Sequence, residues 1–193
     1  MIQPGENVAD FNDALNTLQG SLAYLYTNPS GDRYWYDTRP TLRKTVEDRA
    51  TQLAAVDVEY EIERRLKTLR KEQPFAGLHT CPGSSLDVTD DQAVRLVLLR
   101  PEDGYKASAA AQNNKALMRA EDILNNRGTA PRIYRNMLAF VAPDQDTMYA
   151  LEQEVRRYLA WLSIKNDSED LNLDAAQNRE TDNNCLLYTS RCV

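Results

Sequence analysis

The stretch AVRLVLL, residues 93–99, decides the fold class of this chain. It is a short run of apolar residues between polar loops, which is the pattern of a buried strand. Two further runs have the same character, GLHTC at 77–81 and MLAFVA at 137–142. A helix-forming stretch at 106–126 separates the last two runs, and another follows at 143–165. Strands that alternate with helices are typical of an α/β layer, so we predict a mixed α/β fold.

The two helix-forming stretches carry signals at their ends. The first has a predicted inward face of Leu117, Ala120 and Leu124. Gly128 follows it where a C-terminal cap is expected, because glycine adopts the backbone conformation that ends a helix. For the second stretch, Asp144 or Asp146 lies near the start and can accept from unpaired backbone amides. Both stretches therefore read as bounded helices.

The first third of the chain reads as a helical module with a small hairpin. An amphipathic helix near the start can be capped by Asp10 or Asn12. Its apolar stripe is Phe11, Leu15, Leu18, Leu22 and Leu25. The aromatic run RYWYDT at 33–38 predicts one strand of a hairpin, and Thr41 then opens a long helical region with a break at 55–57. Such a combination could be winged-helix-like.

These patterns divide the chain into four parts. The predicted parts are 1–72 for the helical module, 73–166 for the α/β module, 167–184 for the start of a further helix and 185–193 for a tail. The boundary near residue 73 follows from the interruption of helicity by Pro74 and Gly77, after which short apolar runs begin.

The tail, CLLYTSRCV, differs in character from the polar stretch before it. The codons TGT CTC TTA TAC ACA TCT AGA TGT GTA encode it, and as DNA they resemble a transposase mosaic end used for sequencing libraries, followed by its own reverse complement. We therefore expect an adapter artefact and a natural reading frame that is cut near Asn184. The alternative is a genuine, partly apolar C-terminal segment with a pair of thiols.

Charge and cysteine content exclude several classes of protein. The chain has 29 acidic and 23 basic residues, which argues against a general binder of phosphate backbones. Of its three cysteines only Cys81 lies outside the tail, so neither a disulfide framework nor a cysteine-based zinc site is expected. No stretch approaches the roughly 20 apolar residues that cross a bilayer, and the first residues lack a signal peptide's pattern. We expect a cytoplasmic protein with no membrane partner.

The glycine-bracketed stretch GLHTCPGSS at 77–85 is not a phosphate loop of the Walker A kind. Five residues separate its glycines where four are needed, and Ser84 stands where lysine is required. His79 and Cys81 could share one side of a strand but lack further metal ligands, and DVTDD at 87–91 lacks the spacing of a calcium loop. We therefore predict structural roles, with no catalytic, cofactor-binding or metal-binding residue.

Four basic residues around the aromatic run form a candidate nucleic-acid contact. They are Arg33, Arg39, Arg43 and Lys44. A hairpin on a helical module could present them to nucleic acid. Acidic residues are interleaved with them, so a solvated charged face is the alternative. The interleaved residues are Asp32, Asp37, Glu47 and Asp48.

A second group of arginines precedes the third apolar run. Arg127, Arg132 and Arg135 lie in the stretch NNRGTAPRIYRN. A loop arginine can stabilise the charge that develops during phosphoryl transfer, as an arginine finger does. The alternatives are an interface role or pairing with the many carboxylates of the chain.

Blocks of this chain resemble a family of very large prokaryotic ATP-binding proteins. The blocks are QPGENVADFNDALNTL from Gln3, YLYTNPSGDRYWYDTRPTLRKTVEDRA from Tyr24, PGSSLDVTDDQAVRLVLLRPEDGY from Pro82, RGTAPRIYRNMLAFVAPD from Arg127 and EVRRYLAWLSI from Glu154. Members of this family are AAA-type P-loop ATPases with a long C-terminal region of unknown function, and some relatives accompany phage-defence or restriction systems. The resemblance covers about the whole chain before the tail.

The resemblance implies that the nucleotide-binding core lies upstream and that Met1 is internal to a longer protein. ATP and Mg²⁺ are then expected for the full-length parent, whereas this region would hold no cofactor and would not be catalytic by itself. We expect an accessory region that couples nucleotide state to assembly or client engagement. The alternative is a nucleic-acid-binding adaptor that uses the hairpin and its arginines. Expected partners are the missing N-terminal ATPase core, with further copies of the chain and nucleic acid as additional candidates.

Overall fold

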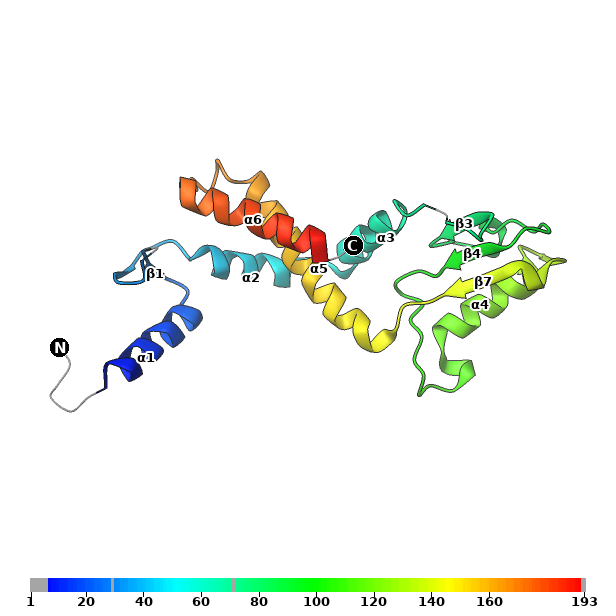
Figure 1. Ribbon diagram of the computed structural model, residues 1–193, viewed down its shortest axis with the longest axis horizontal. Coiled ribbons are helices and arrows are strands. Elements are labelled where there is room, and N and C mark those ends of the chain that lie inside the picture. Colours follow the sequence, from blue (N-terminus) through cyan, green and yellow to red (C-terminus); the bar gives the residue numbers. More distant parts are fainter. Residues whose placement is uncertain (1–6, 29, 71, 192–193) are drawn as a thin grey trace.

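The computed structural model describes residues 7–28, 30–70 and 72–191, and of residues 188–191 the backbone alone. Met1 and the last two residues of the tail lie outside the described residues. The chain forms helices and small sheets, which confirms the predicted mixed α/β class. Figure 1 shows an elongated molecule with helix α1 and a hairpin at one end, an α/β unit at the other, and helices α2, α3, α5 and α6 between them.

A parallel sheet forms the centre of the α/β unit. Its strands are β3 (Gly77–Thr80), β4 (Arg95–Leu98) and β7 (Leu138–Val141), in the spatial order β3-β4-β7. Each strand lies within one of the three predicted apolar runs, so the strand predictions are confirmed. β4 occupies the centre, and its Val97 is fully buried. The core of the unit is Val88, Val97, Leu99, Ala116 and Ile123.

Helix α4 (Lys115–Asn125) connects β4 to β7 and packs on one face of the sheet (Figure 1). It begins later than predicted because a short 3₁₀ segment, η2 (Ala111–Asn113), precedes it. The predicted inward face was right for Ala120, which packs against the core, and wrong for Leu117. Ile123 is fully buried and Ala116 is buried, whereas Leu117 is 37% exposed.

Gly128 does not cap α4 as predicted. It has a φ of 63° and lies in the turn of a small hairpin, between β5 (Asn126–Arg127) and β6 (Ala130–Pro131). A side chain there would be strained by the positive φ. It would also approach Leu86, the middle residue of a further 3₁₀ segment, η1 (Ser85–Asp87). A third 3₁₀ segment, η3 (Arg135–Met137), leads into β7.

Four helices form the middle of the molecule. They are α2 (Leu42–Gln52), α3 (Ala55–Leu66), α5 (Gln145–Asn166) and α6 (Ala175–Arg191). The helix α5 is central, because it packs against α2, α3 and α6. Trp161 and Ile164 of α5 join one apolar cluster with α2 and α6, and Val155 joins another with α3. Thr41 caps α2 and Asp144 caps α5, and both lie where caps were predicted.

Helix α1 (Val8–Ser21) lies at one end of the molecule. Its N-cap is Asn7, whose Oδ1 accepts from the backbone amide of Ala9 at 3.1 Å, so the predicted caps Asp10 and Asn12 were wrong. No residue of α1 is buried. The Arg43 guanidinium of α2 donates to the Gln19 oxygen of α1 at 3.5 Å, but α1 buries no side chain, so the described residues do not form the compact three-helix core of a winged-helix module.

The predicted hairpin is present. β1 (Leu25–Thr27) pairs antiparallel with β2 (Tyr34–Tyr36), which is the predicted aromatic strand. Leu25, which the helical stripe included, is instead buried in β1, because the chain leaves the helix after Ser21. Among the residues that the structure describes, no helix combines the length and apolar character needed to span a membrane.

The contacts of helix α5 do not follow the predicted boundary at residue 166. The division at residue 166 groups it with the α/β module, but its helix contacts are with α2, α3 and α6. Helix α6 begins within the predicted segment 167–184 and continues into the tail. Cys185 of the tail is 9% exposed and packs with Trp161 and Ile164. The adapter origin of the tail stays a prediction about the encoding DNA.

Candidate interaction groove

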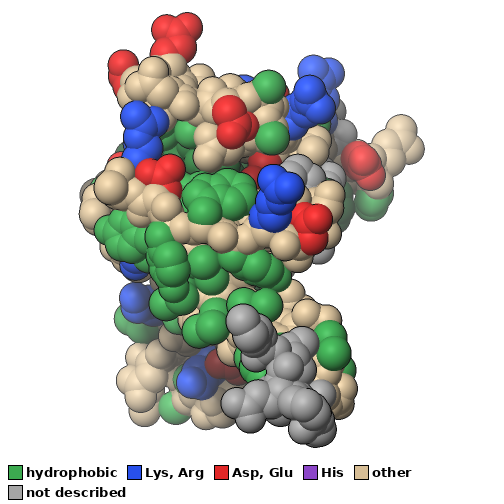
Figure 2. Space-filling view, turned by 90° about the vertical axis from the view of Figure 1, so that its left-hand side faces the viewer, with side chains coloured by type: hydrophobic (Ala, Val, Ile, Leu, Met, Phe, Trp, Pro, Cys, Tyr) green, Lys and Arg blue, Asp and Glu red, His purple; other side chains and the backbone are tan. Residues whose placement is uncertain are grey.

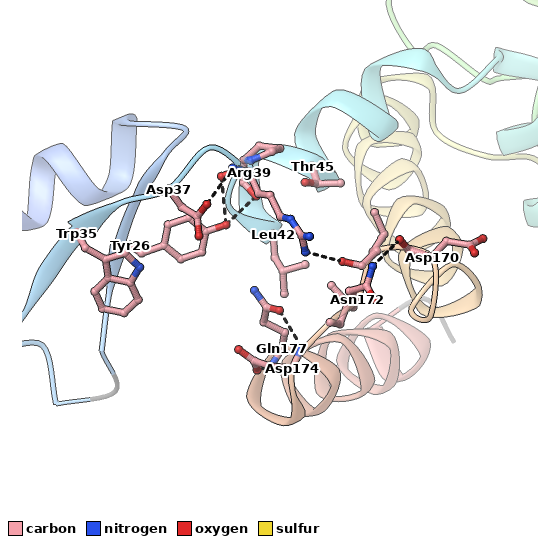
Figure 3. Close-up of a pocket in the computed structure, with 13 residues that line it drawn as sticks. Tyr26, Trp35, Asp37, Arg39, Leu42, Thr45, Asp170, Asn172, Asp174 and Gln177 are labelled. Atoms are coloured by element: carbon pink, nitrogen blue, oxygen red, sulfur yellow. Dashed lines mark hydrogen bonds between the residues drawn. The ribbon is translucent and has the colours of Figure 1, made fainter.

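A groove lies between the hairpin and the connection from α5 to α6 (Figure 3). It has a volume of about 530 Å³. A second hollow of about 750 Å³ adjoins it on the side of α1. Both hollows are lined by Tyr26, Trp35, Leu42, Asp174 and Gln177. We call the two together the hairpin groove.

Tyr26 and Trp35 form the aromatic wall of the hairpin groove. They lie directly opposite each other in β1 and β2, which places both side chains on one face of the hairpin. Their rings stack with centroids 5.9 Å apart and 18° between the ring planes. The Tyr26 hydroxyl donates to the Pro40 oxygen at 3.0 Å, and burial together with Asp37 raises the pKa of Tyr26. Trp35 is 45% exposed, so a ligand can reach its ring.

Carboxylates lie on both sides of the groove (Figure 3). On the hairpin side, Asp37 Oδ1 accepts from the amide of Arg39 at 3.3 Å and from the amide of Thr38 at 2.6 Å. These hydrogen bonds hold the pKa of Asp37 below its ordinary value. On the other side, Asp174 Oδ1 accepts from two backbone amides in the first turn of α6, both at 2.8 Å.

Glu180 adds a further carboxylate, in the hollow beside α1. Partial burial raises the pKa of Glu180, and repulsion from Asp174 raises it further. Within the described part of the chain, the Glu180 carboxylate has no hydrogen bond and no ion pair. Among the described residues, no side chain neutralises the exposed Glu180 carboxylate, which adds a negative charge to the groove.

The predicted nucleic-acid residues lie around the hairpin and α2, where most already have acceptors. Arg43 pairs with Glu47 at 3.5 Å, and Lys44 pairs with Asp48 at 2.7 Å. Arg39 Nη1 donates to the backbone oxygen of Leu171 at 3.5 Å. The interleaved carboxylates thus neutralise part of the basic group. Arg33 is exposed beside the turn of the hairpin. Nucleic-acid contact by these residues stays a prediction.

The loop after β3 is a turn that is closed by a side chain within the loop, that of Asp87. The Ser84 amide donates to Asp87 Oδ2 at 2.8 Å, and the two residues form a capping box around η1. The Ser84 amide is therefore already bound by a carboxylate of the chain itself. Cys81 begins this loop with a φ of 52°, and burial together with Glu63 raises the pKa of its thiol. A protonated, buried thiol is a poor nucleophile.

Among the described residues, no three histidine, cysteine or acidic side chains group as a metal site. The carboxylates of the stretch DVTDD instead hold the fold. Asp90 accepts from the backbone amides of Ile133 and Tyr134, both at 2.9 Å. Asp91 pairs with Arg95 of β4. His79 is partly buried, and burial together with Arg95 lowers its pKa.

Arg132 is a structural residue and cannot reach out as an arginine finger. Its side chain is fully buried, and its guanidinium donates to four backbone oxygens. The acceptors are Ile123, Thr89, Ser85 and Val88, at 2.7, 2.8, 3.2 and 3.0 Å. Arg127 in β5 and Arg135 in η3 are exposed nearby. A finger or interface role for those two stays a prediction.

The helix α5 joins the α/β unit to the hairpin groove. At its start, the Gln145 amide donates to the Tyr105 oxygen at 2.8 Å, beside the sheet. At its end, Asp167 pairs with Arg49 of α2, and Asp170 at the rim of the groove follows three residues later. A helix of 22 residues is about 33 Å long. One rigid helix therefore spans the distance between the α/β unit and the hairpin groove.

The sequence predicts the hairpin half of the groove, but not the half formed by residues 170–177. A signal was present, since Asp174 and Gln177 have the spacing of a capping box, and Gln177 Oε1 accepts from the Asp174 amide at 3.0 Å. Nothing local predicts that this segment faces the hairpin, because Arg39 and Leu171 are 132 positions apart. Comparisons of the chain with protein-family models, curated proteins and solved structures find no match.

Proposed function

We propose that this chain is an accessory region of a large AAA-type ATP-binding protein and couples nucleotide state to assembly or client engagement. ATP and Mg²⁺ would bind to the N-terminal core of that protein. The observation that carries the proposal is α5, which meets the sheet at one end and the hairpin groove at the other. A single packed helix can pass a movement from one end to the other as a rigid body.

Exposed apolar side chains support the role in assembly. Figure 2 shows hydrophobic side chains gathered on the end of the molecule that carries α1 and the hairpin. Val8, Phe11 and Leu18 of α1 are 55%, 42% and 45% exposed. Contiguous apolar surface of this kind is typical of sites that dock on another protein. The capped loop after β3 also favours a nucleotide site elsewhere, because the Asp87 carboxylate that binds its Ser84 amide would repel a phosphate.

The source DNA tests the proposal most directly. We expect the reading frame to continue upstream of Met1 into a GxxxxGK[ST] motif, and to continue past Asn184 without the tail. A native gene that begins at Met1 and encodes the tail would reject the assignment to a larger ATPase.

A second test concerns the chain as it stands. We expect isothermal titration calorimetry with Mg-ATP to detect no binding to the purified chain, because no phosphate cradle is formed by the loop after β3. Saturable binding of ATP by the isolated chain would move the nucleotide site into this region and overturn the proposed division of labour.

A nucleic-acid-binding adaptor is the second candidate. The stacked pair Tyr26–Trp35 favours it, since aromatic rings also serve as platforms for bases. In that case the chain should bind duplex DNA with a steep salt dependence, and Arg39→Glu with Arg43→Glu should abolish binding. The matched control is Arg127→Glu with Arg135→Glu, which makes the same charge change in the α/β unit. Binding that both pairs weaken equally would indicate non-specific attraction.

A further inference from the structure

We infer that the hairpin groove binds a basic segment of a protein partner, with an arginine or lysine side chain between the Trp35 ring and the carboxylates of Asp174 and Glu180. The inference names the class of partner and rests on the proposed function for its biological role. The binding itself can be measured independently of that role.

The uncompensated charge of the groove is negative. Even without Asp170, its lining has the three carboxylates of Asp37, Asp174 and Glu180 against the two arginines Arg39 and Arg43. Arg43 is in addition paired with Glu47. The Glu180 carboxylate has no partner within the part of the chain that is described. Asp174 uses only Oδ1 to cap α6, which leaves Oδ2 without a hydrogen bond in the described structure. A cation from outside the chain complements this pair.

Asp170 does not point toward the aromatic wall of the groove (Figure 3). It lines the groove, but Figure 3 shows its side chain directed away from the hairpin. The contact is therefore assigned to the carboxylates at the start of α6.

The aromatic wall also favours a cationic ligand. A guanidinium or ammonium group is attracted to the face of an indole ring when it lies within about 6 Å of the centroid. Trp35 is held in place by its stack on Tyr26 and is 45% exposed. The chain already uses such a contact elsewhere, where the Arg65 guanidinium lies 4.5 Å from the centroid of the Tyr158 ring.

The floor of the groove favours a peptide over a free cation. Leu42, Leu171 and Leu173 line the hollow and offer apolar contacts to neighbouring side chains of a bound segment. Volumes of about 530 and 750 Å³ accommodate several side chains. A nucleic acid fits less well, since its phosphates would meet Asp174 and Glu180 with charge of the same sign.

The chain has two tryptophans, which allows a direct test. Trp35 lies in the groove, whereas Trp161 is 7% exposed in the helical core and serves as an internal reference. The full chain is labelled with ¹⁵N-tryptophan and titrated with the peptide acetyl-Gly-Leu-Arg-Leu-Arg-Gly-amide. We expect the Trp35 indole resonance to shift saturably and the Trp161 resonance to stay. The same peptide with citrulline in place of arginine keeps the shape without the charge, and should not bind.

Substitutions test whether Asp174 and Glu180 supply the negative charge that binds the peptide. Asp174→Asn combined with Glu180→Gln should weaken peptide binding by about tenfold. Asparagine preserves the cap of α6, so the fold is retained. The control pair Asp146→Asn with Glu152→Gln removes the same charge from α5, away from the groove, and should leave the affinity unchanged.

Three results would overturn the inference. One is the absence of a Trp35 shift with the arginine peptide, and another is equal binding of the citrulline peptide. The third is a saturable Trp35 shift with a DNA duplex that Arg39→Glu and Arg43→Glu remove, which would identify nucleic acid as the occupant. Failure of peptide binding alongside a reading frame that reaches a Walker motif leaves the proposed function intact. Peptide binding without that motif supports the groove and rejects the ATPase assignment.

Discussion

Arg49 of α2 and Asp167 at the end of α5 form an ion pair, with Nη1 and Oδ2 2.6 Å apart. The same guanidinium donates to the Ser163 hydroxyl. We expect Arg49→Ala to lower the free energy of unfolding by about 1 kcal/mol, because the pair joins two helices but is partly exposed to water. Urea unfolding followed by circular dichroism measures the loss, which should shrink at high salt.

The control for this pair is Arg157→Ala. Arg157 pairs with Glu154 within α5 itself and is 56% exposed, so we expect a loss below about 0.5 kcal/mol. A loss as large as that of Arg49→Ala would show that the bridge between the helices contributes no special stability.

Arg132 should be among the most sensitive residues of the α/β unit. Replacing it with methionine leaves four carbonyl oxygens without their donor and Asp90 without its nearby cation, so we expect a loss of about 3–5 kcal/mol. Thermal unfolding reports it. If the methionine variant does not fold, Arg132→Lys provides the measurement, with a smaller loss. The exposed neighbour Arg135→Lys should change stability very little, and similar losses at both positions would contradict the structural role of Arg132.

The phase of α4 can be tested with two truncations in one helix. Ile123→Ala removes a fully buried side chain and should cost about 2–5 kcal/mol in the free energy of unfolding. Leu117→Ala truncates a side chain that is 37% exposed and should cost much less. Urea denaturation of both variants decides the question. The reverse order would restore the inward face that the sequence predicted.

The only histidine of the chain gives a clean pH dependence. Burial and Arg95 lower the pKa of His79 in the folded chain, so the unfolded chain takes up a proton first as the pH falls. Stability should therefore be complete above about pH 6.5, the ordinary pKa of histidine, and decline as the pH falls below it toward the folded pKa. His79→Gln should flatten the decline between about pH 6.5 and 5 in urea titrations. An unchanged slope would contradict the shift, and the His79 proton resonance measures its pKa directly.

The strands of the α/β unit could be predicted because their signal is local. Each apolar run is short and bounded by polar residues, which is enough to place β3, β4 and β7. The inward face of α4 could not be predicted in the same way. The sheet selects the face that lets the helix approach closely, and Ala116 and Ala120 provide it beside Ile123. The predicted face of Leu117, Ala120 and Leu124 included one of these small residues, but it gave weight to the two leucines and omitted Ala116 and Ile123.

Only the hairpin side of the groove could be predicted, because only that side has a local signal in the sequence. The aromatic strand and Arg39 stand out in the sequence, but their counterpart around Asp174 reads only as the polar start of a helix. The two segments meet because α5 and α6 fold back beside α2, and such long-range contacts leave no mark in a single sequence. Arg132 shows the opposite case. Its charge suggested a role at the surface, whereas its guanidinium is buried and donates to four backbone oxygens.

The unbroken helix α5 also sets an angular relationship between the two ends of the molecule. Each residue inserted into it would turn the groove by about 100° around the helix axis relative to the sheet and lengthen the spacing by about 1.5 Å. An insertion of seven residues would restore the orientation to within about 20°. Homologues that change the length of this helix are therefore expected to do so in near-whole turns, so that the groove keeps its direction toward a bound partner.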